Sequence, residues 1–149
     1  MVHLVNNIHF ERLETHDQLQ TYFFMLEEGC RRISKRQGFL TFAPDIYHAL
    51  LDQKVHMVVG FRNGEPKGYF VYYTIQPVIG PSQMYVWLGY IRPGDPEDGI
   101  LAAFAEIETI AKEKGCSQIC FATRRRGWEK LANRVGMRIR DYTFFKGVS

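Results

Sequence analysis

Apolar side chains recur at helical spacing in the first third of the chain. They follow Thr15, which forms a capping box with Gln18 three residues later. This pattern predicts one long amphipathic helix that ends at Gln37-Gly38, because glycine readily terminates a helix. A second, shorter helix is expected from Pro44, since a first helical turn tolerates proline. The stripe of the long helix consists of Leu19, Tyr22, Phe23, Leu26, Cys30 and Ile33.

Runs rich in valine, phenylalanine and tyrosine fill the middle of the chain. His56–Arg62 and Lys67–Gln76 are predicted to pair as an antiparallel hairpin, because the Asn63-Gly64 pair between them suits a tight turn. Met84–Ile91 is expected to be the next strand, buried on both faces. Ile8–Arg12 is expected to be a short first strand.

The last third of the chain alternates between helical and strand patterns. We expect a helix from Ile100 to Gly115, a strand over Gln118–Ala122, a helix over Trp128–Val135 and a final strand over Met137–Phe145. Gly136 is the expected stop of that last helix. The sequence therefore predicts one domain over residues 1–149, an α/β fold of the α+β type. Its sheet is expected to be mixed and mostly antiparallel, with about six to seven strands and about four helices.

Composition excludes several classes of protein. The chain has 149 residues, 46% apolar and 23% charged, as is ordinary for one globular domain. Apolar runs such as Met57–Phe61 are too short to span a membrane, and Met1–Arg12 lacks the features of a secretion signal. The three cysteines, Cys30, Cys116 and Cys120, match neither a disulfide framework nor a zinc site. The protein is therefore expected in a reducing compartment, the cytoplasm.

The densest cationic feature is the segment Arg124-Arg125-Arg126-Gly127-Trp128. Guanidinium groups here could bind phosphate while Trp128 stacks on a base, or the segment could be a solvated turn whose tryptophan anchors a helix. The net charge of +3 permits anionic partners but does not call for nucleic acid. Aromatic residues of the middle strands that face outward would mark a surface for a protein partner.

The second half of the chain carries a set of residues at family-specific spacing. A strand ends at Ile91-Arg92-Pro93, a glycine-containing loop leads to Gly99-Ile100, and the following helix closes with Ala111 and Gly115. Leu131 then precedes Gly136 by five residues. In these residues and in the order of its elements, the chain resembles the GNAT (Gcn5-related N-acetyltransferase) superfamily.

The resemblance implies a function and a site. The chain would transfer an acetyl group from acetyl-CoA to the amine of a small molecule or a protein, with the pyrophosphate held by backbone amides before Gly99. A backbone N–H near Tyr90–Arg92 would hold the thioester oxygen, and Tyr85 and Tyr90 could relay protons. The residues implied to bind the cofactor are Ile91, Arg92, Gly94, Gly99, Ile100, Arg124 and Arg125.

The loop and the catalytic positions also depart from the family pattern. Pro96, Glu97 and Leu101 replace the residues usual in the loop. Its carboxylates, Asp95, Glu97 and Asp98, either repel phosphate or favourably cap a helix N-terminus. The tyrosine that the family commonly uses to protonate the leaving thiolate is replaced by Ala132. Arg125 takes the place of a frequent asparagine.

The short chain and its segment Arg126–Leu131 are also similar to small GNAT-like proteins of tailed bacteriophages. That resemblance implies a second hypothesis, a binding or structural module without catalysis, in a virion or against a host protein.

Overall fold

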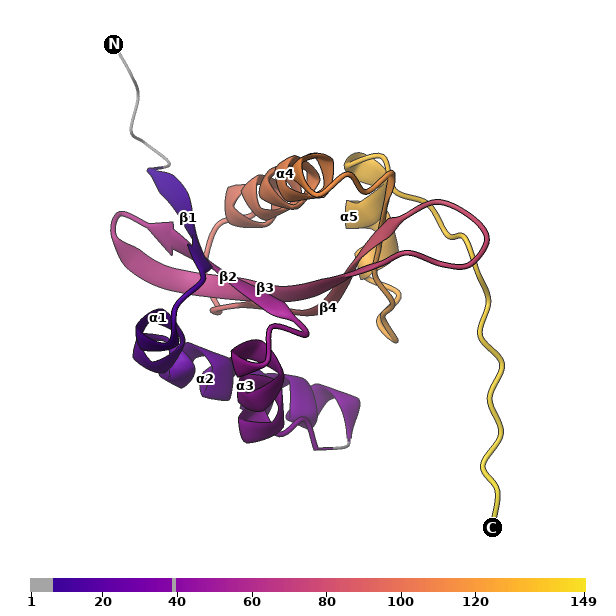
Figure 1. Ribbon diagram of the computed structural model, residues 1–149, viewed down its shortest axis with the longest axis horizontal. Coiled ribbons are helices and arrows are strands. Elements are labelled where there is room, and N and C mark those ends of the chain that lie inside the picture. The colour runs from indigo at the N-terminus through magenta and orange to yellow at the C-terminus, as the bar shows by residue number, and fades with distance from the viewer. Residues whose placement is uncertain (1–6, 39) are drawn as a thin grey trace.

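The computed structural model describes residues 7–38 and 40–149. Five strands form one sheet in the order β1-β2-β3-β4-β5 (Figure 1). Neighbouring strands are antiparallel except β5, which runs parallel to β4. The strands are β1 Ile8–Leu13, β2 His56–Arg62, β3 Glu65–Ile75, β4 Gln83–Ile91 and β5 Gln118–Cys120.

Helices cover both faces of the sheet. Three of them pack on one face and share a large apolar cluster with it, while α4 packs on the other face over a smaller cluster that contains Met84 and Ile110. None of the helices in the described part of the chain is long and apolar enough to cross a membrane. The helices are α1 His16–Thr21, α2 Phe23–Gln37, α3 Ala43–Leu51, α4 Asp98–Glu113 and α5 Trp128–Arg134.

The local signals for turns and helix ends are confirmed. Asn63 and Gly64 have φ angles of 52° and 80°, so the hairpin between β2 and β3 has the predicted two-residue turn. Thr15 and Gln18 form both hydrogen bonds of the capping box. Gly38 ends α2 in the left-handed region at φ 78°.

α2 lies very close to the sheet. A Cβ added at Gly29 would stand 2.1 Å from the hydroxyl oxygen of Tyr69, so only glycine allows this approach. The Tyr69 hydroxyl donates to the carbonyl oxygen of Leu26 at 3.1 Å. The close approach at Gly29 fixes the position of its neighbour Glu28 relative to β3 and β4.

The prediction of a single long first helix was wrong. The helix is interrupted at Tyr22, whose φ and ψ of −103° and 13° separate α1 from α2. The Tyr22 ring packs edge-on against Phe61 of β2, at 5.7 Å between ring centroids. Its hydroxyl lies 3.4 Å from a carboxylate oxygen of Glu11. Tertiary packing of this residue therefore overrides the continuous helical periodicity, and the described part of the chain contains five helices rather than about four.

The predicted final strand over Met137–Phe145 is absent, and residues 7–38 and 40–149 contain five strands rather than six or seven. The pattern of this segment suits a strand, but its neighbour β5 is only three residues long and offers a short ladder. Arg140 instead contacts β5 through its side chain, 3.2 Å from Gln118 Oε1. The end of the chain runs away from the sheet, and Phe144 is 94% exposed.

Candidate cofactor and acceptor site

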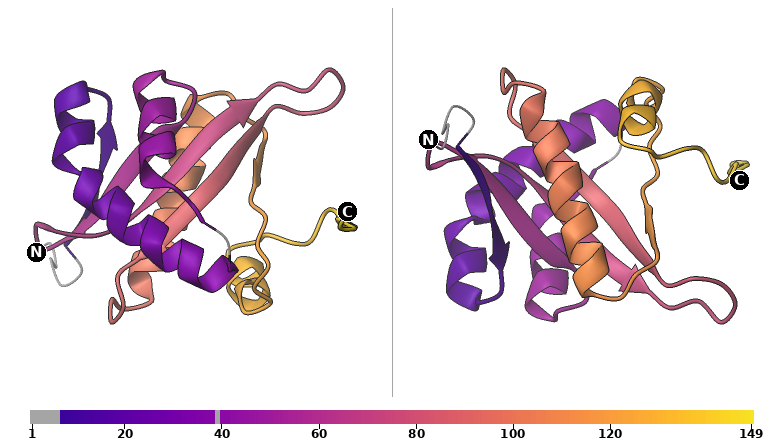
Figure 2. Two further views of the ribbon diagram at one scale, coloured as in Figure 1. Left: turned by 90° about the horizontal axis from the view of Figure 1, so that it is seen from below. Right: turned by 90° about the horizontal axis from the view of Figure 1, so that it is seen from above.

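The two parallel strands of the sheet stay together only briefly. β5 pairs with β4 at Gln83, Met84 and Tyr85. Beyond Tyr85, no strand within residues 7–38 and 40–149 pairs with this edge of β4 (Figure 2). An open strand edge presents unpaired backbone N–H and C=O groups, to which an extended ligand can bind.

A bulge in β4 lies at the point where the strands part. Val71 and Tyr72 of β3 face Leu88 and Val86, so Trp87 is the extra residue in β4. The Trp87 side chain is 42% exposed, which corrects the prediction that this strand is buried on both faces. It is the outward-facing aromatic residue of the middle strands that the sequence led us to expect.

The backbone of β4 places two amides on the open edge. The N–H of Arg92 donates to the carbonyl oxygen of Lys67 at 2.7 Å, so it is directed toward β3. Because backbone groups alternate in direction along a strand, the N–H groups of Gly89 and Ile91 point to the opposite, open edge. A Cβ added at Gly89 would have no atom within 4 Å. The face of the sheet at Gly89 is therefore open, next to the edge to which these amides point.

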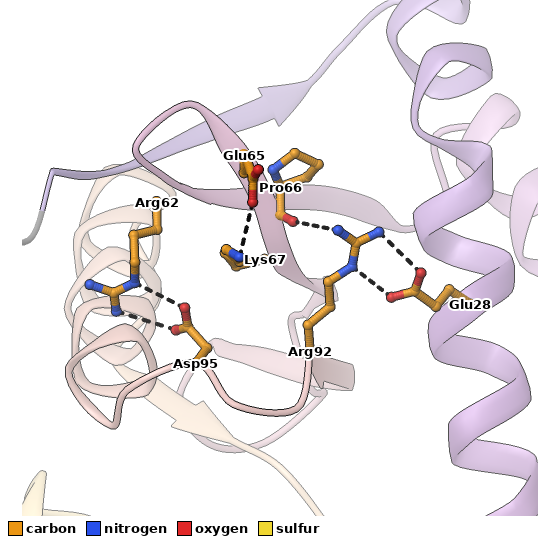
Figure 3. Close-up of polar contacts among 7 residues, drawn as sticks. All are labelled: Glu28, Arg62, Glu65, Pro66, Lys67, Arg92 and Asp95. Atoms are coloured by element: carbon orange, nitrogen blue, oxygen red, sulfur yellow. Dashed lines mark hydrogen bonds and ion pairs between the residues drawn. The ribbon is translucent and has the colours of Figure 1, made fainter.

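The loop before α4 holds the carboxylate of Asp95 close to the start of the helix. Asp95 is bound by the guanidinium group of Arg62, with Nε 2.9 Å from Oδ1 and Nη2 3.3 Å from Oδ2 (Figure 3). Arg62 Nη2 also bonds Asp98. A Cβ added at Gly99 would stand 2.2 Å from Asp95 Oδ2. The absent side chain of Gly99 thus makes room for the Asp95 carboxylate, at the helix end where the resemblance placed pyrophosphate.

The first amides of α4 are already hydrogen-bonded. The N–H of Gly99 donates to the carbonyl oxygen of Pro96, and that of Ile100 to Glu97, each at 3.0 Å. Gly94, with φ 89°, supplies the left-handed turn that lets the loop fold back in this way. Glu97 forms an ion pair with Arg134 of α5. All three loop carboxylates are therefore paired with arginines, which offsets much of the repulsion expected from them.

Arg92 is paired with Glu28 of α2 (Figure 3), and Tyr90 bonds the same carboxylate. The Tyr90 hydroxyl donates to Glu28 Oε2 at 2.6 Å, and Arg92 Nε donates to the same oxygen at 2.8 Å. Arg92 also donates to the carbonyl oxygen of Pro66 at 3.1 Å. The guanidinium group, expected to bind the cofactor, thus joins α2, β3 and β4.

These contacts shift two pKa values in opposite directions. The hydrogen bond from Arg92 lowers the pKa of Glu28 below its ordinary value. Burial, followed by the hydrogen bond to Glu28, raises the pKa of Tyr90 to about 12. A carboxylate with a lowered pKa is a weak base and a phenol with a raised pKa is a weak acid. Tyr90 is thus poorly suited to proton transfer. The other predicted tyrosine, Tyr85, is half-buried and stacks on Tyr73, with 5.3 Å between the ring centroids.

The linked pKa shifts predict a stability that falls at high pH. The pKa of Tyr90 is raised on folding, so its contribution is present below about pH 10, the ordinary tyrosine value, and is lost as the pH rises toward 12. We expect Tyr90→Phe to flatten the fall in melting temperature over this range and to remove one late step from the tyrosinate absorbance titration. A Tyr90 that ionises near pH 10 would contradict this assignment.

Arg124 and Arg125 lie in the exposed loop between β5 and α5. The Arg125 N–H donates to Thr123 Oγ1 at 3.1 Å, which orders the turn. Trp128 packs edge-on against Phe121, with ring centroids 5.9 Å apart, as in the interpretation of this tryptophan as a helix anchor. Arg124 and Arg125 thus belong to the loop after β5, whereas the other predicted cofactor residues belong to the end of β4, the loop that follows it and the start of α4.

Sequence reasoning missed two residues that shape this region, Arg62 and Gly89. Arg62 ends β2 and is remote from Asp95 in sequence, so no local motif connects the two. Gly89 did carry a signal, because a glycine within an apolar strand often marks a bulge or a close backbone approach.

Solved structures share this fold over nearly their whole length. An aminoglycoside acetyltransferase from an uncultured soil metagenomic sample, in complex with sisomicin, is 13% identical and has a TM-score of 0.73, covering 95% of this chain and 97% of its own. A predicted acetyltransferase from Clostridium acetobutylicum, with acetyl-CoA, is 12% identical with a TM-score of 0.68, covering 94% and 96%. An integron cassette protein from the mobile metagenome of V. cholerae is 17% identical with a TM-score of 0.67, covering 94% and 93%.

No protein-family model matches the chain, and no curated protein matches its sequence. At these identities the likeness establishes the fold. The chain has the mixed α+β fold of acetyltransferases, consistent with the GNAT superfamily that its sequence resembles.

Proposed function

We propose that this protein is an N-acetyltransferase that passes an acetyl group from acetyl-CoA to an amine. The observation that carries the proposal is the open edge of β4 beyond the bulge at Trp87, toward which the N–H groups of Gly89 and Ile91 point. The pantetheine arm of acetyl-CoA contains amide groups, so it can bind such an edge as an added strand would.

Acetyl-CoA would supply a thioester. The amine nitrogen attacks the thioester carbon, the carbon–sulfur bond breaks, and the amine proton must reach the leaving sulfur. In this chain the amides of Gly89 and Ile91 are suited to orienting the donor and to holding the carbonyl oxygen. Tyr85 is the better placed of the two predicted tyrosines to relay the proton, because Tyr90 is bound to Glu28.

The other end of the donor fits less well. The Asp95 carboxylate occupies the position beside Gly99, and the first amides of α4 bond the loop itself. Both features oppose the binding of pyrophosphate, so acetyl-CoA should bind weakly. The same features favour the second candidate, a GNAT-like binding module without catalysis. The three free cysteines suit the reducing conditions of the cytoplasm, which we propose as the location.

The test is amine-dependent release of the CoA thiol. We expect wild-type protein to release thiol from acetyl-CoA in the presence of a primary amine. Tyr85→Phe is expected to lower kcat about tenfold or more with little change in KM. Tyr73→Phe, in the stacking partner of Tyr85, is the matched control and should retain activity. Absence of amine-dependent release across a broad panel of amines would favour the binding module.

A further inference from the structure

The C-terminal half of α2, which carries two arginines, lies near the loop that follows β5. Arg32 and Arg36 are four residues apart and therefore share one side of the C-terminal half of α2. The loop between β5 and α5, which contains Arg125, reaches toward this end of α2 (Figures 1 and 2). Two segments that are remote in sequence and carry arginines thus lie side by side.

The charges of these arginines act on one another. Partial burial lowers the pKa of Arg36, and the positive charges of Arg125 and then Arg32 lower it further. The charge of Arg32 also acts on Tyr90, whose hydroxyl is bound to Glu28. These effects agree with the course of the backbone, in which the loop after β5 lies beside the C-terminal half of α2 (Figures 1 and 2).

The carboxylates of α2 do not neutralise this group. Glu27 is paired with Arg31 at 3.9 Å, and Glu28 is paired with Arg92 at 2.8 Å. Among residues 7–38 and 40–149, Arg32, Arg36 and Arg125 form no ion pair. Like charges held together are unfavourable unless an anion offsets them, and guanidinium groups bind phosphate and carboxylate in a forked geometry.

We propose that Arg32, Arg36 and Arg125 form an anion site that binds the phosphate or carboxylate group of the acceptor amine. This inference rests on the proposed acetyltransferase function. α2 covers the face of the sheet opposite to α4, so the site lies across the sheet from the helix that would flank the donor. The acceptor is then an acidic amine, and polycationic amines such as sisomicin are repelled.

Direct binding of inorganic phosphate tests the site without requiring catalysis. Wild-type protein should show saturable shifts in its backbone amide NMR signals near Arg36 on titration with phosphate. Arg36→Gln and Arg125→Gln should each weaken this binding about fivefold or more. Arg31→Gln is the matched control, because it removes the same charge from the same helix, and it should change the affinity less than twofold. Equal losses in all three variants, or no binding by wild-type protein, would overturn the site.

A second pair of assays identifies the source of the anion. Phosphoethanolamine and ethanolamine differ only in the phosphate group. We expect kcat/KM to be at least about tenfold higher for phosphoethanolamine, and Arg36→Gln should abolish this preference. Equal rates would overturn the acceptor assignment. A second result would also overturn it. If Arg36→Gln weakens the binding of acetyl-CoA but not of acetyl-dephospho-CoA, the anion that the site binds belongs to the donor. If phosphate binds yet no amine is acetylated, the anion site stands and the proposed function fails.

Discussion

Replacing Gly89 with phenylalanine is expected to abolish detectable binding of acetyl-CoA while leaving the melting temperature nearly unchanged. A Cβ at this position meets no atom within 4 Å, so the ring would fill the space beside the open edge of β4 instead of clashing with the core. Aromatic residues are also more favourable than glycine within a strand. Calorimetric titration and thermal unfolding of the same preparation would measure both effects.

Gly89→Ala is the control for this substitution. Its methyl group adds little volume, so binding should weaken by no more than a few fold. If Gly89→Phe binds acetyl-CoA as wild-type protein does, the donor does not lie along β4. If the variant is strongly destabilised, the space beside Gly89 is not free and the account of this edge is wrong.

Replacing Asp95 with alanine is expected to strengthen acetyl-CoA binding about tenfold. The substitution removes the carboxylate beside Gly99, so one repelling charge is lost, while Arg62 keeps its bond to Asp98. The loop should also become less ordered, so a lower melting temperature without ligand and a larger stabilisation by acetyl-CoA are expected.

Glu97→Ala provides the comparison for Asp95→Ala. It removes an equal charge from the same loop, but Glu97 is paired with Arg134 of α5 and does not occupy the space beside Gly99. Its effect on acetyl-CoA affinity should therefore be smaller. Equal effects of the two substitutions would show that only the net charge of the loop matters. Weaker binding by Asp95→Ala would show that the Arg62–Asp95 pair holds the loop in its binding conformation.

Local chemistry made most of the fold predictable from the sequence. Asn63-Gly64 defined the hairpin because few other residue pairs adopt two positive φ angles, and Thr15 defined a helix start through its capping box. The separation at Tyr22 was not predictable, because it depends on packing against Phe61 of a strand that comes much later. No strand forms after Gly136 because β5 is only three residues long, and the apolar pattern of residues 118–122 does not reveal this short length.

The candidate site was less predictable for a related reason. The match of Gly99 to the family pattern suggested a phosphate cradle, but the space at Gly99 is filled by Asp95, held in place by Arg62 from another strand. Arg92 likewise stands in the expected position, while its guanidinium group joins the fold through Glu28 and Pro66. A residue's position in a motif is readable from sequence, whereas the partner of its side chain depends on tertiary contacts.

Calorimetric titration of acetyl-CoA into wild-type protein and Asp95→Ala tests the central claim most directly. We predict one-to-one binding to wild-type protein with a Kd on the order of 0.1–1 mM, and tighter binding to the variant. No saturable heat for either protein at millimolar acetyl-CoA would contradict the assignment of a donor site to the open edge of β4 and the N-terminus of α4.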